Sequence, residues 1–328
     1  MTSVHAYAAN SALPDELRAL VTRHYGDGPN FPYFLHDFER AYAYAAENPQ
    51  VRFLPFSAEN GHLALIVDAR RPEGEAFFGF MEGDEATLAA LWEECVRVAK
   101  SEGIRRLLGP VNGSAWHQYR AMTETDGSPY FKSELPSLPH YAPFLSARGP
   151  ETTVGYYSAY RTKFDAILAL GVGAKERAEA AGLTVERVDA PGLPELSSVV
   201  ALSRAIFKDN WGYTELSDAE FAALYGPGKL ASSFRRMYFL SHAGKRIGFG
   251  STFNEPGGVM LCKTIGLLPE YQGKGLGNLL AYEMHKDAAE EGIGKIMYAL
   301  IREGNNIQRF PVEDAVVFRK YATYEFSL

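Results

Sequence analysis

The sequence predicts an α/β protein built from two similar halves. At 328 residues the chain exceeds the ~100–200 residues usual for one domain, so two domains are expected. Two stretches also resemble each other, "AKSEGIRRLLGPVNG" from Ala99 and "AAEEGIGKIMYALIREG" from Ala288. Each ends a helical pattern, turns at Glu-Gly-Ile and enters an apolar strand. The chain therefore repeats a unit of strand, loop, helix and strand, with a domain boundary expected near residue 165.

The first half is expected to combine strands with two helices. Apolar residues at every third or fourth position from Leu88 to Ala99 predict an amphipathic helix. Gly103 follows, where a helix commonly ends in a left-handed residue. The other expected elements are a helix at Phe34–Glu47, strands at Val51–Phe56, His62–Arg70 and Ala76–Phe80, a Pro-rich irregular region at Gly127–Pro143 and a closing strand at Glu151–Tyr160.

The second half is expected to repeat this order. The apolar face formed by Leu276, Leu279, Leu280 and Met284 predicts an amphipathic helix, and Gly292 ends it. The other expected elements are a connecting helix at Asp165–Gly182, helices near Pro194–Phe207 and Ser217–Leu224, and strands at Leu183–Asp189, Arg236–Ser241, Ile247–Phe253 and Val259–Leu268.

Composition excludes several classes of protein. The net charge of −7 argues against a polyanionic partner such as nucleic acid. Cys95 and Cys262 lie in apolar segments without CxxC or Cys/His spacing, so we expect neither a disulfide framework nor a metal site. No signal peptide and no apolar run of about 18 residues is evident. We therefore expect a cytoplasmic protein that does not bind membranes.

The stretch Gln272-Gly273-Lys274-Gly275-Leu276-Gly277 lies between an apolar strand and an amphipathic helix. At a helix start, main-chain N–H groups lack helical partners and the helix dipole leaves partial positive charge. Removing side chains lets a phosphate approach these groups closely, and Lys274 adds a full positive charge. Glycines at such a junction often make only a tight turn, but three of them alternating behind Gln272 favour a site for a diphosphate.

The spacing of these glycines excludes two nucleotide-binding motifs. A dinucleotide-binding turn reads G-x-G-x-x-G and is followed by an acidic residue about 20 positions later, which this sequence lacks. A P-loop needs four residues between its first glycine and Gly-Lys-Ser/Thr, and these are also absent.

The segment resembles the acetyl-CoA signature of the GNAT superfamily of N-acetyltransferases, V/L-x-P-x-x-R/Q-G-x-G-x-G/A after a strand. Leu267, Pro269, Gln272, Gly273, Gly275 and Gly277 fill it. The resemblance implies that the main chain of the preceding strand pairs with the pantetheine arm, that the loop holds the pyrophosphate and that an asparagine after the next strand reaches the cofactor. The implied acetyl-CoA or acyl-CoA contacts are Ile265, Gly266, Leu267, Gln272, Gly273, Lys274, Gly275, Leu276, Gly277, Asn278 and Asn306.

The whole chain is similar to a tandem subgroup of this family, through "FFGFME" from Phe77, "GPVN" from Gly109 and "FRKY" from Phe318. The resemblance implies two lobes, residues 1–165 and 166–328, each a mixed, mostly antiparallel sheet flanked by helices. The loop of the first lobe, "MEGDEA", carries Glu82, Asp84 and Glu85, which would repel a pyrophosphate but suit a helix start. We therefore expect only the second lobe to bind the CoA ester, and the first, degenerate lobe to shape the acceptor groove.

Acyl transfer to an amine needs a donor for the oxyanion and groups that move protons. By resemblance, the oxyanion donor is the backbone N–H near Leu267. The tyrosine acid usual in the family would fall at Glu313, so that assignment fails. Tyr321 and Tyr324 are substitute acids, although tail tyrosines are more often buried strand residues, and Glu255 and Glu303 are candidate bases, although such acids usually lie at the surface.

Aromatic and polar residues in two loops are candidates for the acceptor pocket, and packing alone would explain them equally well. They are Asn112, Trp116 and Tyr119 after the "GPVN" turn, and Trp211 and Tyr213 in "NWGY".

The sequence thus predicts a GNAT-type N-acyltransferase that moves an acyl group, expected to be acetyl, from CoA to a primary amine of a small molecule or peptide. No metal is implied. A non-catalytic acyl-CoA-binding or regulatory module is the alternative, because the usual tyrosine is missing. A two-lobed transferase that uses charged tRNA is a third possibility, and the acidic balance disfavours it.

Overall fold

The computed structural model describes residues 3–189, 193–225, 234–304 and 314–328, which form two compact units. Unit 1 comprises residues 1–156, 211–214 and 319–328, and unit 2 comprises residues 157–210 and 215–318. The first passage between them occurs after Tyr156, which lies within ten residues of position 165. The chain then returns twice to unit 1, once for only four residues and once for its C-terminal segment.

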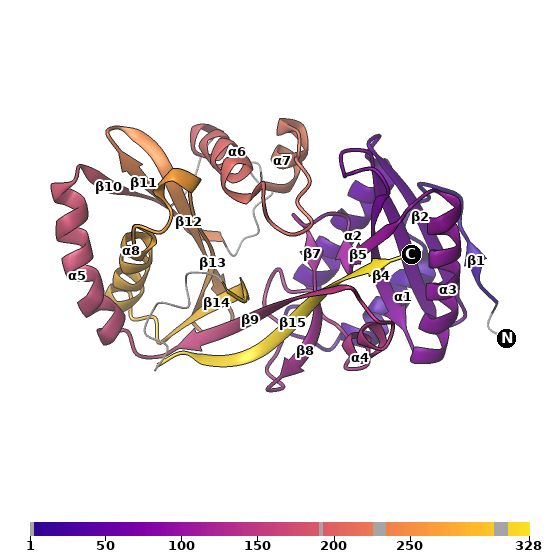
Figure 1. Ribbon diagram of the computed structural model, residues 1–328. Coiled ribbons are helices and arrows are strands. Elements are labelled where there is room, and N and C mark those ends of the chain that lie inside the picture. The colour runs from indigo at the N-terminus through magenta and orange to yellow at the C-terminus, as the bar shows by residue number, and fades with distance from the viewer. Residues whose placement is uncertain (1–2, 190–192, 226–233, 305–313) are drawn as a thin grey trace. The chain divides into compact units, whose positions relative to one another are not determined.

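Unit 1 contains a sheet with helices on both faces (Figure 1). The strand order is β1-β2-β3-β4-β5-β15, and β8 also pairs with β15. Its helices are α1 (Asp15–Tyr25), α2 (Phe31–Glu47), α3 (Glu85–Ser101) and α4 (Tyr141–Ser146). Its strands are β1 (His5–Ala6), β2 (Val51–Ala58), β3 (Gly61–Asp68), β4 (Glu75–Gly83), β5 (Arg106–Gly109), β8 (Ala121–Thr125) and part of β15 (Val316–Ser327), with β6 (Val111–Asn112) and β7 (Gln118–Tyr119) as a separate pair.

Two apolar cores sandwich the sheet of unit 1. One core packs the α3 stripe of Leu88, Leu91 and Cys95 against one face. The other packs Phe34 and Phe38 of α2, with residues of α1, against the opposite face. The strands are consequently buried on both faces, which explains why β4 is a nearly continuous apolar run.

Unit 2 has the strand order β9-β14-β13-β12-β11-β10. Its helices are α5 (Asp165–Ala180), α6 (Leu193–Phe207), α7 (Asp218–Tyr225) and α8 (Gly277–Glu290). Its strands are β10 (Leu183–Val188), β11 (Phe234–His242), β12 (Lys245–Glu255), β13 (Val259–Leu267), β14 (Lys295–Arg302) and the second part of β9 (Thr152–Arg161). Helices α5 and α8 pack together on one face, and Gly171 of α5 leaves the space that the ring of Tyr282 fills.

The predicted fold class is confirmed. Among the described strand pairs, only β4–β5 and β13–β14 are parallel, so each unit has a mixed, mostly antiparallel sheet. The predicted helix ends are also confirmed, since Gly103 has φ +75° and Gly292 has φ +71°. Helices α1 and α4 were not predicted.

Candidate functional site

In unit 2, strands β13 and β14 separate halfway along their length. Their parallel pairing covers Val259 to Cys262 and Lys295 to Tyr298, and in the described chain it goes no further. Past this point Leu300 of β14 adopts a left-handed φ of +56°, and its N–H donates to Ser158 Oγ of β9 at 3.0 Å. A residue other than glycine rarely adopts this conformation, and this one lies just beyond the last paired residues of β13 and β14. One edge of β13 from Lys263 to Leu267 is therefore not paired with β14.

The hydrogen bonds of β13 decide which main-chain groups face this open edge. The Leu268 N–H donates to Ile247 O of β12 at 2.9 Å, and Leu267 lies opposite Gly248. Consecutive residues of an antiparallel strand direct their N–H groups to opposite sides. The N–H groups of Leu267 and Ile265 consequently point to the open edge, whereas that of Gly266 points to β12.

The predicted diphosphate loop follows directly after β13 and a short 3₁₀ turn at Pro269–Tyr271. Gly273 and Gly275 have φ values of +73° and +74°, a conformation that side chains disfavour. The Gln272 side chain donates from Nε2 to Leu267 O at 2.8 Å, which ties the loop to the end of the strand. Within the described chain, the N–H groups of residues 273–277 form no hydrogen bond.

Gly277 begins helix α8 and, unlike Gly273 and Gly275, does not have a positive φ that would require glycine. A Cβ there would lie 3.9 Å from Ile265 Cγ2 and 4.0 Å from Leu267 Cδ1, which are ordinary contact distances. Nothing in the protein itself therefore prevents a side chain at this position. A bare main chain at the helix start leaves room for a ligand to approach closely.

Helix α8 begins without a side-chain cap and without an acidic residue in its first turn. Its positive dipole end is therefore not neutralised by the chain itself. Lys274 is exposed and lies 5.5 Å from the centre of the Tyr271 ring, so it contributes positive charge beside the same N–H groups. The loop and helix start together present a set of N–H donors of the kind that can bind phosphate groups.

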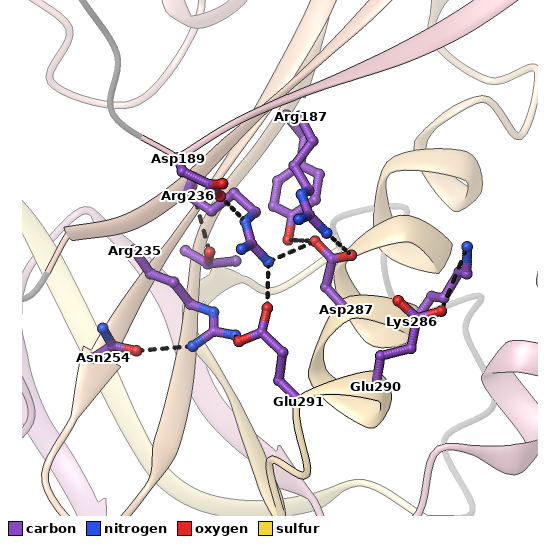
Figure 2. Close-up of polar contacts among 11 residues, drawn as sticks. Arg187, Asp189, Arg235, Arg236, Asn254, Lys286, Asp287, Glu290 and Glu291 are labelled. Atoms are coloured by element: carbon purple, nitrogen blue, oxygen red, sulfur yellow. Dashed lines mark hydrogen bonds and ion pairs between the residues drawn. The ribbon is translucent and has the colours of Figure 1, made fainter.

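A network of ion pairs fixes helix α8 on the sheet (Figure 2). Buried Asp287 of α8 accepts hydrogen bonds from Arg236 Nη1 and Arg187 Nη1, each at 2.8 Å, and from the Tyr238 hydroxyl at 2.6 Å. Arg236 also binds Glu291 at 2.8 Å, and this contact holds the pKa of Glu291 below its usual range. These contacts hold α8 by its C-terminal half and leave its N-terminus for the loop.

The corresponding loop of unit 1 is closed by its own side chains. Buried Glu82 accepts hydrogen bonds from His24 Nδ1 at 2.9 Å, the Tyr141 hydroxyl at 2.8 Å and the Tyr25 hydroxyl at 3.2 Å. Burial raises the pKa of Glu82, although these donors oppose the shift. Asp84 caps α3 by accepting the Thr87 N–H at 2.8 Å, and this backbone bond lowers the pKa of Asp84. The prediction that these acidic residues suit a helix start is thus confirmed for Asp84, which caps α3.

The edge of β4 in unit 1 is also filled. The segment after β5 runs so close to β4 that a Cβ on Gly79 would lie 1.7 Å from Val111 O. Phe80 adopts a φ of +50°, and its N–H donates to Asn112 Oδ1 at 2.7 Å. In unit 2, within the described chain, the edge of β13 is not paired with β14 beyond Cys262. In unit 1 the chain itself lies along the corresponding edge of β4.

The structure places the predicted catalytic residues in different surroundings. Tyr321 lies in unit 1, is 2% exposed and donates its hydroxyl to Glu134 Oε1 at 2.6 Å. Glu134 is paired with Arg319, so this hydroxyl belongs to a buried network. Glu303 is exposed at the end of β14 in unit 2. The N–H of Leu267 faces the open edge, and Asn306 lies outside the described residues.

Four of the five predicted acceptor residues form an aromatic cluster in unit 1. The return segment 211–214 stacks Trp211 on Tyr119 with ring centres 5.9 Å apart, and places Tyr213 5.8 Å from Trp116. Both indole N–H groups are used, by Thr214 O and by Glu325 Oε1, each at 2.7 Å. The side chain of Asn112 instead supports Phe80.

Sequence reasoning missed the residues that separate β13 from β14. Ser158 and Leu300 come from strands 142 residues apart, and neither belongs to a motif. A positive φ at a leucine leaves no signal in the sequence.

Comparisons with known proteins agree with this geometry. Residues 201–309 match the acetyltransferase (GNAT) family. No protein in a search of curated sequences matches significantly. No described helix is long and apolar enough to cross a membrane.

Solved structures resemble the chain over nearly its whole length. A tandem GNAT protein from the clavulanic acid biosynthesis pathway, solved without AcCoA, has a TM-score of 0.56 at 13% identity, over 99% of this chain and 98% of that one. A GCN5-related N-acetyltransferase from Sphaerobacter thermophilus has a TM-score of 0.51 at 11% identity, over 99% of this chain and 95% of that one. A probable N-acyltransferase from Enterococcus faecalis V583, a conserved protein of unknown function, gives 0.59 at 10% identity, over 100% and 73%.

The open strand edge and bare helix start lie within the matched residues, and the two-unit fold extends over the rest of the chain. Residues 201–309 thus match the acetyltransferase (GNAT) family, and the chain as a whole has the fold of a tandem GNAT protein.

Proposed function

We propose that the protein transfers an acyl group from acyl-CoA to a primary amine of a small molecule or peptide. The observation that carries this proposal is the continuity in unit 2 between the open edge of β13 and the unpartnered N–H groups of residues 273–277. An extended amide-containing arm can pair with such an edge, and a diphosphate can bind at such a helix start. Bound acyl-CoA would supply the acyl group as a thioester.

The chain's own residues are assigned as follows. The loop from Gln272 to Asn278 binds the diphosphate, and the main chain of Ile265 and Leu267 orients the pantetheine arm. The Leu267 N–H donates to the oxygen of the reacting carbonyl, where negative charge develops. The amine nitrogen bonds to the acyl carbon, the carbon–sulfur bond breaks, and the proton lost by the amine ends on the CoA sulfur.

The assignments of Tyr321 and Glu303 remain predictions. Tyr321 is held by Glu134, so Tyr321→Phe tests whether its hydroxyl acts in transfer or only stabilises unit 1. A catalytic hydroxyl would lower kcat with little change in the unfolding free energy. A structural one would lower the unfolding free energy by roughly 1 kcal/mol and leave kcat unchanged.

Calorimetric titration with acetyl-CoA, followed by measurement of thiol release with a panel of amines, tests the proposal. We expect binding in the micromolar range and thiol release that depends on an amine. Binding without release on any amine would favour the non-catalytic acyl-CoA-binding module. Failure to bind any CoA ester would refute the donor site itself, and release that requires charged tRNA would point to an aminoacyl transferase.

A further inference from the structure

A cavity of about 320 Å³ lies in unit 2 at the point where β13 and β14 separate. Its walls include Cys262 and Ile265 of β13, Tyr298 and Ile301 of β14, and Ala281 and Met284 of α8. Strand β9, helix α5 and the start of β15 complete the lining. Because Cys262 and Tyr298 are the last paired residues of the two strands, the cavity begins where the open edge begins.

The wall of the cavity is predominantly apolar, and two of its polar side chains, His285 and Tyr298, are bonded to each other. His285 Nδ1 donates to Ala281 O at 2.6 Å, so its Nε2 accepts from the Tyr298 hydroxyl. Burial lowers the pKa of His285 to about 4, which keeps the ring neutral at neutral pH. Burial likewise raises the pKa of Cys262 to about 12 and keeps it a thiol. Among the described residues, the wall also contains the charged side chain of Arg161, which lies beside Tyr298.

The cavity adjoins the proposed donor site through Ile265. This side chain lines the cavity and also lies 3.9 Å from the Cβ position of Gly277 at the start of α8. The open edge of β13 leads from the loop back to Cys262, a distance of five residues or roughly 17 Å. A thioester whose carbonyl accepts from the Leu267 N–H would therefore direct its acyl chain along this edge, past Ile265, into the cavity.

The size of the cavity exceeds what an acetyl group fills. A dry cavity of about 150 Å³ lined by aliphatic and aromatic side chains accommodates benzene, so 320 Å³ suits an apolar group of roughly six to ten carbons. An acetyl group contributes a single methyl and would leave most of this space empty.

We propose that this cavity holds the acyl chain of the donor, so that the protein binds a medium-length apolar acyl-CoA more tightly than acetyl-CoA. The inference rests on the proposed function and extends it to the chemical class of the donor. Each methylene moved from water into such a site favours binding, so octanoyl-CoA should bind at least ~10-fold more tightly than acetyl-CoA.

Calorimetric titration of the full chain with CoA, acetyl-CoA, hexanoyl-CoA and octanoyl-CoA tests the inference directly. We expect affinity to rise with chain length. Ala281→Leu adds three carbons to the cavity wall and should reduce the affinity for octanoyl-CoA about 10-fold while leaving CoA and acetyl-CoA unchanged. Ala289→Leu, on the exposed side of the same helix, is the matched control and should change none of these affinities.

Val317→Trp gives a second test at a partly exposed rim position, where the new side chain is easier to accommodate than in the core. This substitution too should weaken the binding of octanoyl-CoA while leaving the binding of CoA and acetyl-CoA unchanged. Equal affinity for all chain lengths would overturn the inference and leave the proposed function intact. An equal loss of affinity for CoA and for octanoyl-CoA in the Ala281→Leu variant would also overturn the inference, because the cavity would then hold the pantetheine arm. Absence of CoA binding in the unaltered protein would overturn both.

Discussion

The two units begin their sheet-covering helices in opposite ways. In unit 1, Asp84 caps α3, Glu85 lies in its first turn, and the preceding Glu82 is buried among three donors. In unit 2, α8 begins with glycine after a loop of unpartnered N–H groups. The first arrangement satisfies the helix start from within the chain. The second leaves the N–H groups of residues 273–277 without partners in the described chain.

The strand edges differ in the same sense. In unit 1 the segment containing Val111 and Asn112 lies along β4, whereas in unit 2 the strands separate and a cavity remains. In unit 1 the chain itself therefore occupies the positions that are open in unit 2.

Gly275→Glu should have the largest effect, because it places a carboxylate among the N–H groups proposed to bind a diphosphate and so makes this loop acidic like that of unit 1. We expect at least ~100-fold weaker binding of CoA by calorimetry, from repulsion and lost hydrogen bonds. The left-handed φ of +74° adds roughly 1–2 kcal/mol of strain. Gly257→Glu is the matched control, with φ +78° and open space in the same unit. Normal CoA binding by Gly275→Glu would contradict the assignment of the loop.

Acid should destabilise both units through their buried histidines. Burial lowers the pKa of His62 in unit 1 and of His285 in unit 2 to about 4. Between pH 6.5 and 4 the unfolded chain binds a proton that the folded chain does not, so the unfolding free energy falls as the pH is lowered. The shift from 6.5 to about 4 corresponds to roughly 3 kcal/mol for each histidine.

Urea unfolding at pH 7 and pH 4.5 measures this effect. All three tryptophans, Trp92, Trp116 and Trp211, belong to unit 1, so their fluorescence reports on that unit. His62→Gln should reduce the pH dependence of the fluorescence transition. His285→Gln should reduce the pH dependence seen by circular dichroism, and an unchanged dependence in both variants would show that other groups control acid unfolding.

Asn112→Ala should lower the stability of unit 1 without changing the affinity of the protein for CoA. The substitution leaves the Phe80 N–H without its acceptor in the core, at a cost of roughly 1–3 kcal/mol in unfolding free energy. CoA affinity should not change, because the filled edge of β4 is not the donor site. Asn112→Asp, which keeps the acceptor oxygen, should recover part of the stability. A selective loss of CoA binding in Asn112→Ala would place the donor in the first unit.

Asp84→Ala should have the smallest effect, a loss of about 1 kcal/mol from removal of the cap of α3. The bond to Thr87 lowers the pKa of Asp84, so this contribution is present above the pKa of the unfolded carboxyl, about 3.9, and is lost as the pH falls through the lower folded pKa. Thermal unfolding of the variant at pH 7 and pH 3 checks both points. A difference from the unaltered protein that grows toward pH 3 would refute the capping role.

The sequence by itself determined the elements and the distinction between the two loops. Apolar periodicity located α3 and α8, and glycines marked their ends, because these are local properties of the chain. The acids of "MEGDEA" and the glycines of "GKGLG" differ in charge and conformational freedom, which act within a few residues. Helix α1 escaped prediction although Leu17, Leu20 and Val21 form an apolar stripe, because the helix is short and Pro14 at its start carries no capping side chain.

Only the tertiary structure decided what the adjoining edges can hold. The left-handed Leu300 depends on Ser158 of a distant strand, and the filled edge of β4 depends on Asn112 reaching Phe80. The cavity beside Ile265 has walls from six elements spread between residues 157 and 317. No local pattern encodes such an enclosure, because its volume is set by how separate strands and helices pack around a shared space.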